Sequence, residues 1–172
     1  IDLGNATLLP GFIDAHVHLD GELQQDFFRA FHTNMFRFPV EQAHYAALYA
    51  KRTLEAGFTT VRNLGAGDFL DIGLRNAINA SVIPGPRMLT AAHSVGSTGG
   101  HCDNSPFPPD VIEPSGPIEG VCNGADECRA AVRYQMKWGA DVIKSCASGG
   151  VLSEADPVDV PQLTPEELTA IM

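Results

Sequence analysis

Four short apolar runs alternate with helical segments along the chain. The runs lie at residues 12–19, 58–64, 87–92 and 140–145, and each has the length of a buried strand. Apolar spacing and end signals predict helices over residues 40–56, over residues 125–138 and from Thr164 onward. Strands that alternate with helices pair in parallel through right-handed crossovers. The pattern therefore predicts an α/β fold with a parallel sheet.

The number of strand–helix units limits the choice of architecture. Four units occupy about 160 residues, whereas a closed eight-unit barrel needs about 250. The last predicted helix reaches the final residue, Met172, after about two turns. The chain is thus either half of a barrel or a four-stranded open sheet, and the short last helix favours an N-terminal fragment of a longer protein.

Long connections follow three of the predicted strands. They lie at residues 19–25, 93–123 and 146–163. Loops that follow the carboxyl ends of strands carry the functional sites of barrels and open sheets alike. The 93–123 segment is rich in Gly and Pro and too long for a simple connector. We interpret it as a loop that covers a site.

Composition excludes several classes of protein. The 172 residues are 44% hydrophobic and 19% charged, which is typical of one globular domain. A formal net charge of −10 disfavours nucleic acid as a partner. No apolar run approaches the length of about 18 residues that a membrane span needs. The N-terminus shows no signal-peptide pattern, but it also lacks an initiator Met, so the cellular compartment stays open.

The four cysteines are Cys102, Cys122, Cys128 and Cys146. They form no C-x-x-C pair, so the spacing is not that of a zinc knuckle. We expect free or buried thiols. If the protein is exported, Cys102 and Cys122 are candidates for a disulfide, because they flank one Pro-rich loop.

Two histidines lie close together in the first predicted strand. Because side chains alternate along a strand, His16 and His18 share one face with Asp14. The opposite face, from Ile13 to Leu19, is apolar and is expected to pack on helices. Imidazoles two residues apart can both reach one metal ion. The alternative is a pair of exposed or hydrogen-bonded histidines on an edge strand.

The stretch LLPGFIDAHVHL resembles the first barrel strand of the amidohydrolase superfamily, the metal-dependent hydrolases built on a (β/α)8 barrel. The segments GFTTVRNLG (57–65), STGGHCD (97–103) and GADVIKSCASGG (139–150) follow in the order of that family. The branch they resemble includes Xaa-Pro dipeptidases and imidazolonepropionase-related proteins. The resemblance implies the N-terminal half of a TIM-like barrel, with His16 and His18 as metal ligands.

Lys144 is the third candidate metal ligand. It lies near the end of the fourth predicted strand, where a charged amine is costly to bury. A neutral amine can add carbon dioxide to give a carbamate, and in the family such a carboxylated lysine bridges two divalent ions. The resemblance therefore implies a carbamate on Lys144 and two metal ions, with zinc as the default. The alternative is a lysine that extends to solvent from a strand end or pairs with Asp141 or Glu154.

The resemblance also implies what lies outside the chain. The remaining metal ligands and the general-base aspartate are expected beyond residue 172, so no catalytic residue is assigned here. His101, in the loop after the third strand, is a candidate substrate-binding residue. We expect residues 1–10 to be the last strand of a flanking β-sandwich and residues 11–172 to be the first four βα units.

The function implied is hydrolysis of an amide C–N bond, with a dipeptide-like Xaa-Pro or related small molecule as substrate. The fragment alone is expected to be inactive, and the full-length protein is a candidate homo-oligomer. One alternative is a mononuclear amidohydrolase of the imidazolonepropionase or deaminase type. Another is a non-catalytic α/β module that binds a partner or a small anion through its Gly-rich loops.

Overall fold

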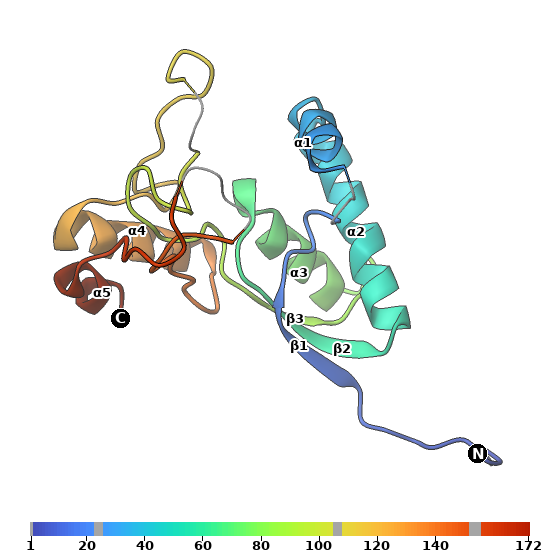
Figure 1. Cartoon of the computed structure of the whole chain (residues 1–172). Coiled ribbons are helices and arrows are strands. Elements are labelled where there is room, and N and C mark those ends of the chain that lie inside the picture. The colour runs from blue at the N-terminus through green and yellow to red at the C-terminus, as the bar shows by residue number, and fades with distance from the viewer. Residues whose placement is uncertain (1, 23–25, 105–107, 152–155) are drawn as a thin grey trace.

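The computed structural model describes residues 2–22, 26–104, 108–151 and 156–172 (Figure 1). The regular elements in chain order are β1 (Phe12–Val17), α1 (Phe27–Met35), α2 (Pro39–Glu55), β2 (Phe58–Asn63), the 3-10 turn η1 (Gly67–Phe69), α3 (Leu70–Asn79), β3 (Arg87–Thr90), α4 (Gly124–Trp138) and α5 (Pro165–Ile171). The three strands form one parallel sheet in the order β1-β2-β3. The predicted α/β class is confirmed.

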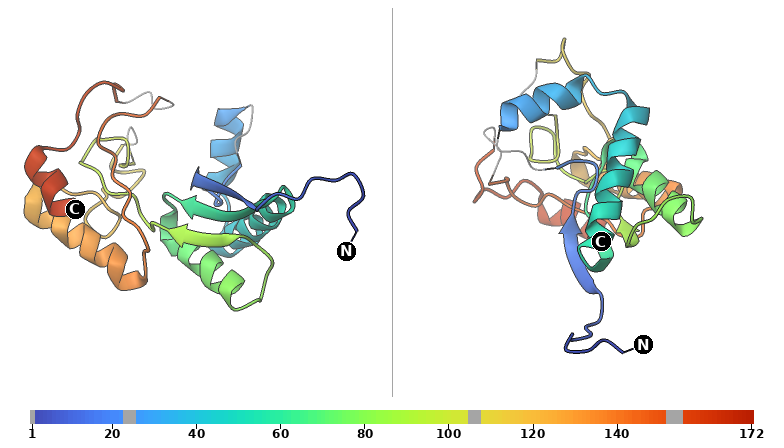
Figure 2. Two further views of the ribbon diagram at one scale, coloured as in Figure 1. Left: turned by 90° about the horizontal axis from the view of Figure 1, so that it is seen from below. Right: turned by 90° about the vertical axis from the view of Figure 1, so that its right-hand side faces the viewer.

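Helices α2 and α3 cover one face of the sheet (Figure 2). Val61 of β2 and Met88 of β3 are buried on that face against Ala46, Ala50 and Leu74. Burial of these side chains is the main source of stability in this part of the molecule, at roughly 25 cal/mol per Å² of apolar surface.

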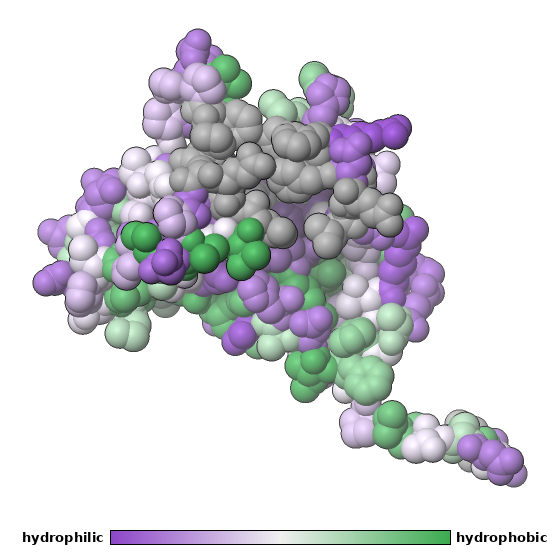
Figure 3. Space-filling view, viewed as in Figure 1, coloured by the Kyte–Doolittle hydropathy of each residue, from purple (hydrophilic) through white to green (hydrophobic). Residues whose placement is uncertain are grey.

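The opposite face of the sheet carries exposed apolar side chains. Phe12 and Leu89 lie there, and neither is buried. Figure 3 shows apolar surface near the base of the N-terminal arm. The expectation that Ile13 packs on a helix is wrong, since 73% of its surface is exposed. Strand β1 is an edge of the sheet, and only its carboxyl end, at Val17 and Leu19, reaches the core.

A second core lies between α4, α5 and the loops that lead to them (Figure 1). Its buried members are Val95, Cys122, Cys128, Ala131, Leu163 and Ile171. Helix α5 begins with the predicted capping box, in which Thr164 and Glu167 exchange side-chain to backbone hydrogen bonds. Amide groups of Thr164 and Gly124 also hold the pKa of Glu167 below its usual range.

The fourth predicted strand, residues 140–145, is absent from the described part of the chain. The Asp141 and Val142 amides both donate to the Thr90 carbonyl, and pairing resumes only where the Val95 amide donates to Lys144. A single parallel bridge, between Val95 and Ser145, results. The reason is a bend between the two contacts, because Ala92 adopts a left-handed conformation with φ of 59°.

Asp141 fixes this fourth segment to the end of β3. Its carboxylate accepts hydrogen bonds from the Thr90 amide at 2.9 Å and the Thr90 hydroxyl at 3.0 Å. Arg75 of α3 donates to the same oxygen at 2.5 Å and to the Gly139 carbonyl at 2.7 Å. The segment that carries Lys144 is therefore tied to both a strand and a helix of the sheet layer.

The cysteines form two disulfides, Cys102–Cys146 and Cys122–Cys128. Both expectations, of free thiols and of a Cys102–Cys122 pair, are wrong. The Cα atoms of the observed pairs are 6.0 Å and 5.0 Å apart, which is the usual disulfide separation. The first crosslink joins the loop after β3 to the segment after Lys144, and the second closes the end of that loop on α4.

Two helices were not delimited by the apolar pattern, α1 and α3. The signal for α3 is the i, i+4 spacing of Leu70, Leu74 and Ile78, which the preceding glycines obscured. The 93–123 segment is irregular wherever it is described, as predicted, although residues 23–25, 105–107 and 152–155 of the predicted loops lie outside the described ranges. No helix within those ranges has the length and apolar character needed to cross a membrane.

The N-terminal residues 2–11 form an arm that projects away from the sheet (Figure 1). They form no strand, and one turn is stabilised by a hydrogen bond from the Gly4 amide to Asp2. The β-sandwich strand expected at residues 1–10 stays a prediction.

We expect Asp141→Asn to destabilise the protein by about 1–2 kcal/mol at pH 7. Burial opposes ionisation, but the Thr90 and Arg75 hydrogen bonds outweigh it and hold the pKa of Asp141 below its usual range. The carboxylate therefore stabilises the fold above the pKa of the unfolded chain, and this contribution is lost as pH falls through the folded-state pKa. Urea unfolding of both proteins at pH 7 and pH 3 should show a difference that shrinks at pH 3.

The matched control is Asp126→Asn, because the Asp126 carboxylate pairs with Arg129 on the surface of α4. It should leave stability at pH 7 unchanged. A destabilisation by Asp141→Asn that is equal at both pH values would contradict the assignment.

We expect the two disulfides to differ in their contribution to stability. They close loops with sequence separations of 44 and 6 residues, and loop-closure entropy predicts about 4 and about 2 kcal/mol respectively. The double variants Cys102→Ser/Cys146→Ser and Cys122→Ser/Cys128→Ser test this by urea unfolding, after peptide mapping without reductant has verified the pairing. A larger loss from the Cys122–Cys128 variant would refute the prediction.

Candidate functional site

A cleft of about 590 Å³ lies at the carboxyl ends of the three strands. Its lining comes from the end of β1, the turn after β2, the loop after β3 and the segment around Lys144. All four residues singled out from the sequence line it: His16, His18, His101 and Lys144. The structure thus brings together side chains that are up to 128 positions apart in the chain (144 minus 16).

The two histidines of β1 lie side by side at the cleft wall. Their ring centroids are 5.4 Å apart. Asp14 does not touch the rings; its carboxylate accepts the His16 backbone amide at 3.0 Å. Partial desolvation and then the positive charge of Lys144 lower the pKa of His16 below its usual range, although its side chain is largely exposed. A lowered pKa favours the neutral imidazole, which is the form that binds metal.

The orientation of His18 is fixed by the main chain. Its Nδ1 lies 3.1 Å from the carbonyl oxygen of Gly65, in the turn after β2. A carbonyl can only accept, so Nδ1 carries the proton and Nε2 is left as the lone-pair donor. Metal-binding histidines use the same arrangement, with the second ring nitrogen donating to a carbonyl or carboxylate.

Behind His18, the side chain of Asn63 connects the strand ends. It is fully buried; its Oδ1 accepts the Leu19 amide at 2.8 Å, and its Nδ2 donates to the Gly65 carbonyl at 3.2 Å. The Gly65 oxygen is therefore held between Asn63 and His18. A buried amide with both ends satisfied rigidifies its surroundings.

Asp71 continues this network towards β3. It is 2% exposed, and its carboxylate accepts the amides of Ile72 at 2.8 Å and Ala92 at 3.0 Å. Burial raises the pKa of Asp71, while hydrogen bonds from Ala92, Ile72 and Asn63 act in the opposite direction. The residues after β1, β2 and β3 are thus joined by two buried polar side chains.

Lys144 approaches the histidines from the fourth segment. It is half-buried; its carbonyl accepts the Val95 amide at 2.7 Å, and the Cys146 amide donates to the Val95 carbonyl at 2.8 Å. This short parallel pairing sets the backbone on both sides of the lysine. Lys144 and His16 line the same cleft, and the positive charge of Lys144 contributes to the lowered pKa of His16.

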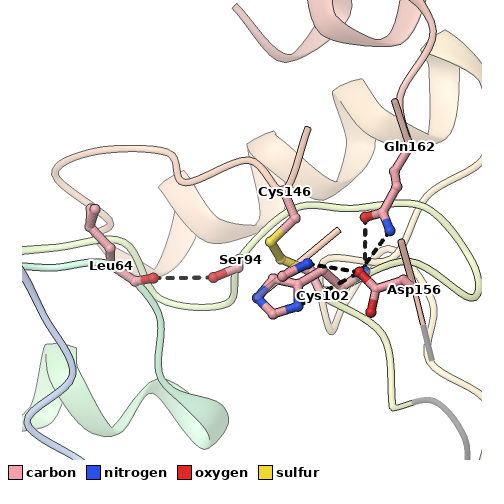
Figure 4. Close-up of a disulfide and its surroundings, with 8 residues drawn as sticks. Leu64, Ser94, Cys102, Cys146, Asp156 and Gln162 are labelled. Atoms are coloured by element: carbon pink, nitrogen blue, oxygen red, sulfur yellow. Dashed lines mark hydrogen bonds and ion pairs between the residues drawn. A yellow bond between two sulfur atoms is a disulfide. The ribbon is translucent and has the colours of Figure 1, made fainter. Parts of the chain in front are cut away.

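His101 lies on the other side of the cleft, beside the Cys102–Cys146 disulfide. Its Nδ1 is 3.9 Å from a carboxylate oxygen of Asp156, and its backbone amide donates to Gln162 at 2.9 Å. Gln162 also donates to Asp156 at 2.9 Å (Figure 4). The disulfide thus anchors the loop that carries His101 next to the segment that carries Lys144.

The donor set suits a divalent metal ion in part. Two imidazoles and an amine line the same cleft, and the ring nitrogen of His18 that remains for a ligand is the unprotonated one. Within the described residues, however, no group of three or more His, Cys, Asp or Glu side chains is placed to hold a metal ion.

The sequence matches the amidohydrolase family model over residues 7–172. The chain therefore belongs to the amidohydrolase family. Ochratoxinase from Aspergillus niger is 32% identical over 179 residues, which cover 96% of this chain and 36% of the fungal protein. The chain spans little more than a third of that relative.

Solved structures agree with this assignment. A Xaa-Pro dipeptidase with methionine in its active site superposes with a TM-score of 0.82 at 38% identity, over 94% of this chain and 39% of that one. A prolidase in complex with N-methylphosphonate-L-proline gives a TM-score of 0.74 at 30% identity, over 99% and 43%. The sheet is thus part of a TIM barrel, and the predicted half-barrel is confirmed.

Sequence reasoning missed three residues of the site: Asn63, Asp71 and His93. The available signal for Asn63 was its place two residues after Val61, on the apolar face of the strand, where a polar side chain needs a partner when buried. Asp71 offered none, because an acidic residue in the first turn of a helix is ordinary. His93 stood in a long loop without characteristic spacing, and only the structure shows that it lines the cleft.

We expect Asn63→Ala to lower the free energy of unfolding by about 2–4 kcal/mol, because it leaves the Leu19 amide without its side-chain acceptor and removes one of the hydrogen bonds to the Gly65 carbonyl. Urea unfolding measures the loss. Asn79→Ala, at the exposed end of α3, is the control and should change stability by less than about 0.5 kcal/mol. Equal effects of the two substitutions would show that the Asn63 network does not stabilise the strand ends.

Proposed function

We propose that the full-length protein is a metal-dependent hydrolase that cleaves an amide C–N bond through two divalent ions bridged by a carboxylated lysine. One observation carries the proposal: in a chain of the amidohydrolase family, His16, His18 and Lys144 line a single cleft at the carboxyl ends of the strands. Barrel enzymes place their active sites at this end.

In this proposal each of the three residues has a defined role. His16 and His18 would bind one ion through neutral imidazole nitrogens. The lowered pKa of His16 favours its neutral form, and the hydrogen bond to Gly65 favours the tautomer of His18 with a free Nε2. The neutral amine of Lys144 adds carbon dioxide and loses one proton, which gives a carbamate with two ligand oxygens. Zinc is the ion expected for such a nitrogen and oxygen donor set.

The remaining groups serve the substrate. Two divalent ions in such a site lower the pKa of bound water and polarise a carbonyl group. His101 lies across the cleft, where its imidazole can hydrogen-bond a carbonyl or carboxylate of the substrate. The general-base aspartate that passes a proton to the leaving nitrogen is supplied by a part of the protein outside this chain.

The comparisons direct the choice of substrate. Two of the solved relatives are a Xaa-Pro dipeptidase and a prolidase, so a dipeptide such as alanyl-proline is the first compound to test. The similarity to ochratoxinase adds ochratoxin as the second.

We expect the full-length protein to contain two equivalents of zinc by elemental analysis and to hydrolyse alanyl-proline. Lys144→Ala should remove at least one equivalent and lower kcat/KM by about 100-fold or more, since even residues behind metal ligands contribute 10–100-fold. Reconstitution of metal-free protein should be faster with bicarbonate, which supplies the carbamate carbon.

Lys51→Ala is the matched control, because Lys51 pairs with Glu55 on the exposed side of α2. It should keep both metal content and activity. A metal-free active protein would exclude the proposed hydrolase, and a protein with neither metal nor activity would favour a binding module. One equivalent of metal, unaffected by Lys144→Ala, would indicate a mononuclear enzyme.

A further inference from the structure

His93 has the features of a functional residue, although the proposed metal chemistry does not use it. It lies three residues after the end of β3, is half-buried, and lines the same cleft as His16 and His18. Its ring faces the same space that a substrate would occupy, so contact with the substrate is the role to consider.

The tautomer of His93 is determined by Gln135 of α4. Gln135 is fully buried; its Oε1 accepts the His93 backbone amide at 3.3 Å, and its Nε2 donates to the Ile118 carbonyl at 3.1 Å. These two main-chain contacts fix which end of the amide is oxygen. The His93 Nδ1 lies 3.1 Å from this same oxygen and must be the donor. The neutral ring then has an unprotonated Nε2.

The position of the His93 ring is also constrained. Phe69 packs edge-on against it, with centroids 4.7 Å apart and planes at 82°. Phe69 and Ala92, the residue before His93, both adopt left-handed backbone conformations, with φ of 55° and 59°. Such conformations are costly for residues other than glycine and cluster at functional sites. The Ala92 amide is held in place by Asp71 at 3.0 Å.

The chemistry of this ring defines what it can bind. Among the described residues, Nε2 of His93 has no hydrogen-bonding partner, so it offers an acceptor to the cleft. A substrate that uses this acceptor must present an N–H or O–H group. In an Xaa-Pro dipeptide the scissile nitrogen carries no hydrogen, which leaves the terminal amino group as the donor.

We propose that His93 is a substrate-binding residue whose Nε2 accepts a hydrogen bond from the amino group of a dipeptide substrate, with Gln135 holding the ring in the required tautomer. This inference rests on the proposed function and deepens it. It assigns the recognition of the amino end of the substrate to the loop after β3, away from the histidine pair of β1.

The test compares two substrates that differ only in the amino group, alanyl-proline and propionyl-proline, in the full-length protein. His93→Leu should lower kcat/KM for alanyl-proline about 10- to 100-fold, the range of a hydrogen bond to a charged group. For propionyl-proline, the same substitution should change kcat/KM by less than about threefold. If propionyl-proline is only a competitive inhibitor, its inhibition constant should change by less than about threefold. Gln135→Leu should act in the same direction with a smaller effect.

When both compounds are measured as substrates, the ratio of their kcat/KM values is independent of how much of each variant is folded. His44→Leu, at an exposed position of α2, is the matched control and should leave the ratio unchanged. Equal losses for both compounds with His93→Leu, or no loss for either, would overturn the inference. A wild-type protein that neither cleaves nor binds either compound would overturn the proposed function and the inference with it.

Discussion

The buried hydrogen bonds of Asn63 and Asp71 are the constraint on which the rest of the site depends. They connect the residues that follow β1, β2 and β3, three segments that pair as strands only further back in the sheet. At the strand ends only single backbone hydrogen bonds remain, such as those from the Leu64 amide to Val17 and from the Ala66 amide to Ala92, so side chains satisfy other amides and carbonyls. Because both side chains are buried, water cannot replace them, and the strand ends keep one relative position.

A second set of contacts brings in the fourth segment, which does not pair as a regular strand. Asp141 attaches the start of this segment to Thr90 and Arg75, and the short pairing at Val95 holds its end. The Cys102–Cys146 disulfide then secures the loop across the cleft. Lys144 lies between these attachments. Its place beside the histidines therefore follows from contacts on either side of it.

Periodicity and spacing predicted much of this molecule and failed at identifiable places. The alternation in residues 12–19 placed His16 and His18 on one face correctly, because a strand has a fixed period. The prediction of a fourth strand was wrong because Ala92, which adopts a left-handed conformation, interrupts the pairing. An alanine in the sequence gives no signal of that conformation. The expectations for the cysteines were wrong for a related reason. Which cysteines meet depends on how the 93–123 loop folds back, and that is a tertiary property.

Main-chain geometry orients two of the cleft histidines. His18 donates to the Gly65 carbonyl, and His93 donates to an amide oxygen whose direction is itself set by main-chain groups. Neither acceptor titrates in the physiological range, so the orientation of each ring does not depend on the charge of a neighbouring acid. Both rings are left with an unprotonated Nε2. In the function proposed above, the same physical means would orient His18 towards a metal ion and His93 towards a substrate amine.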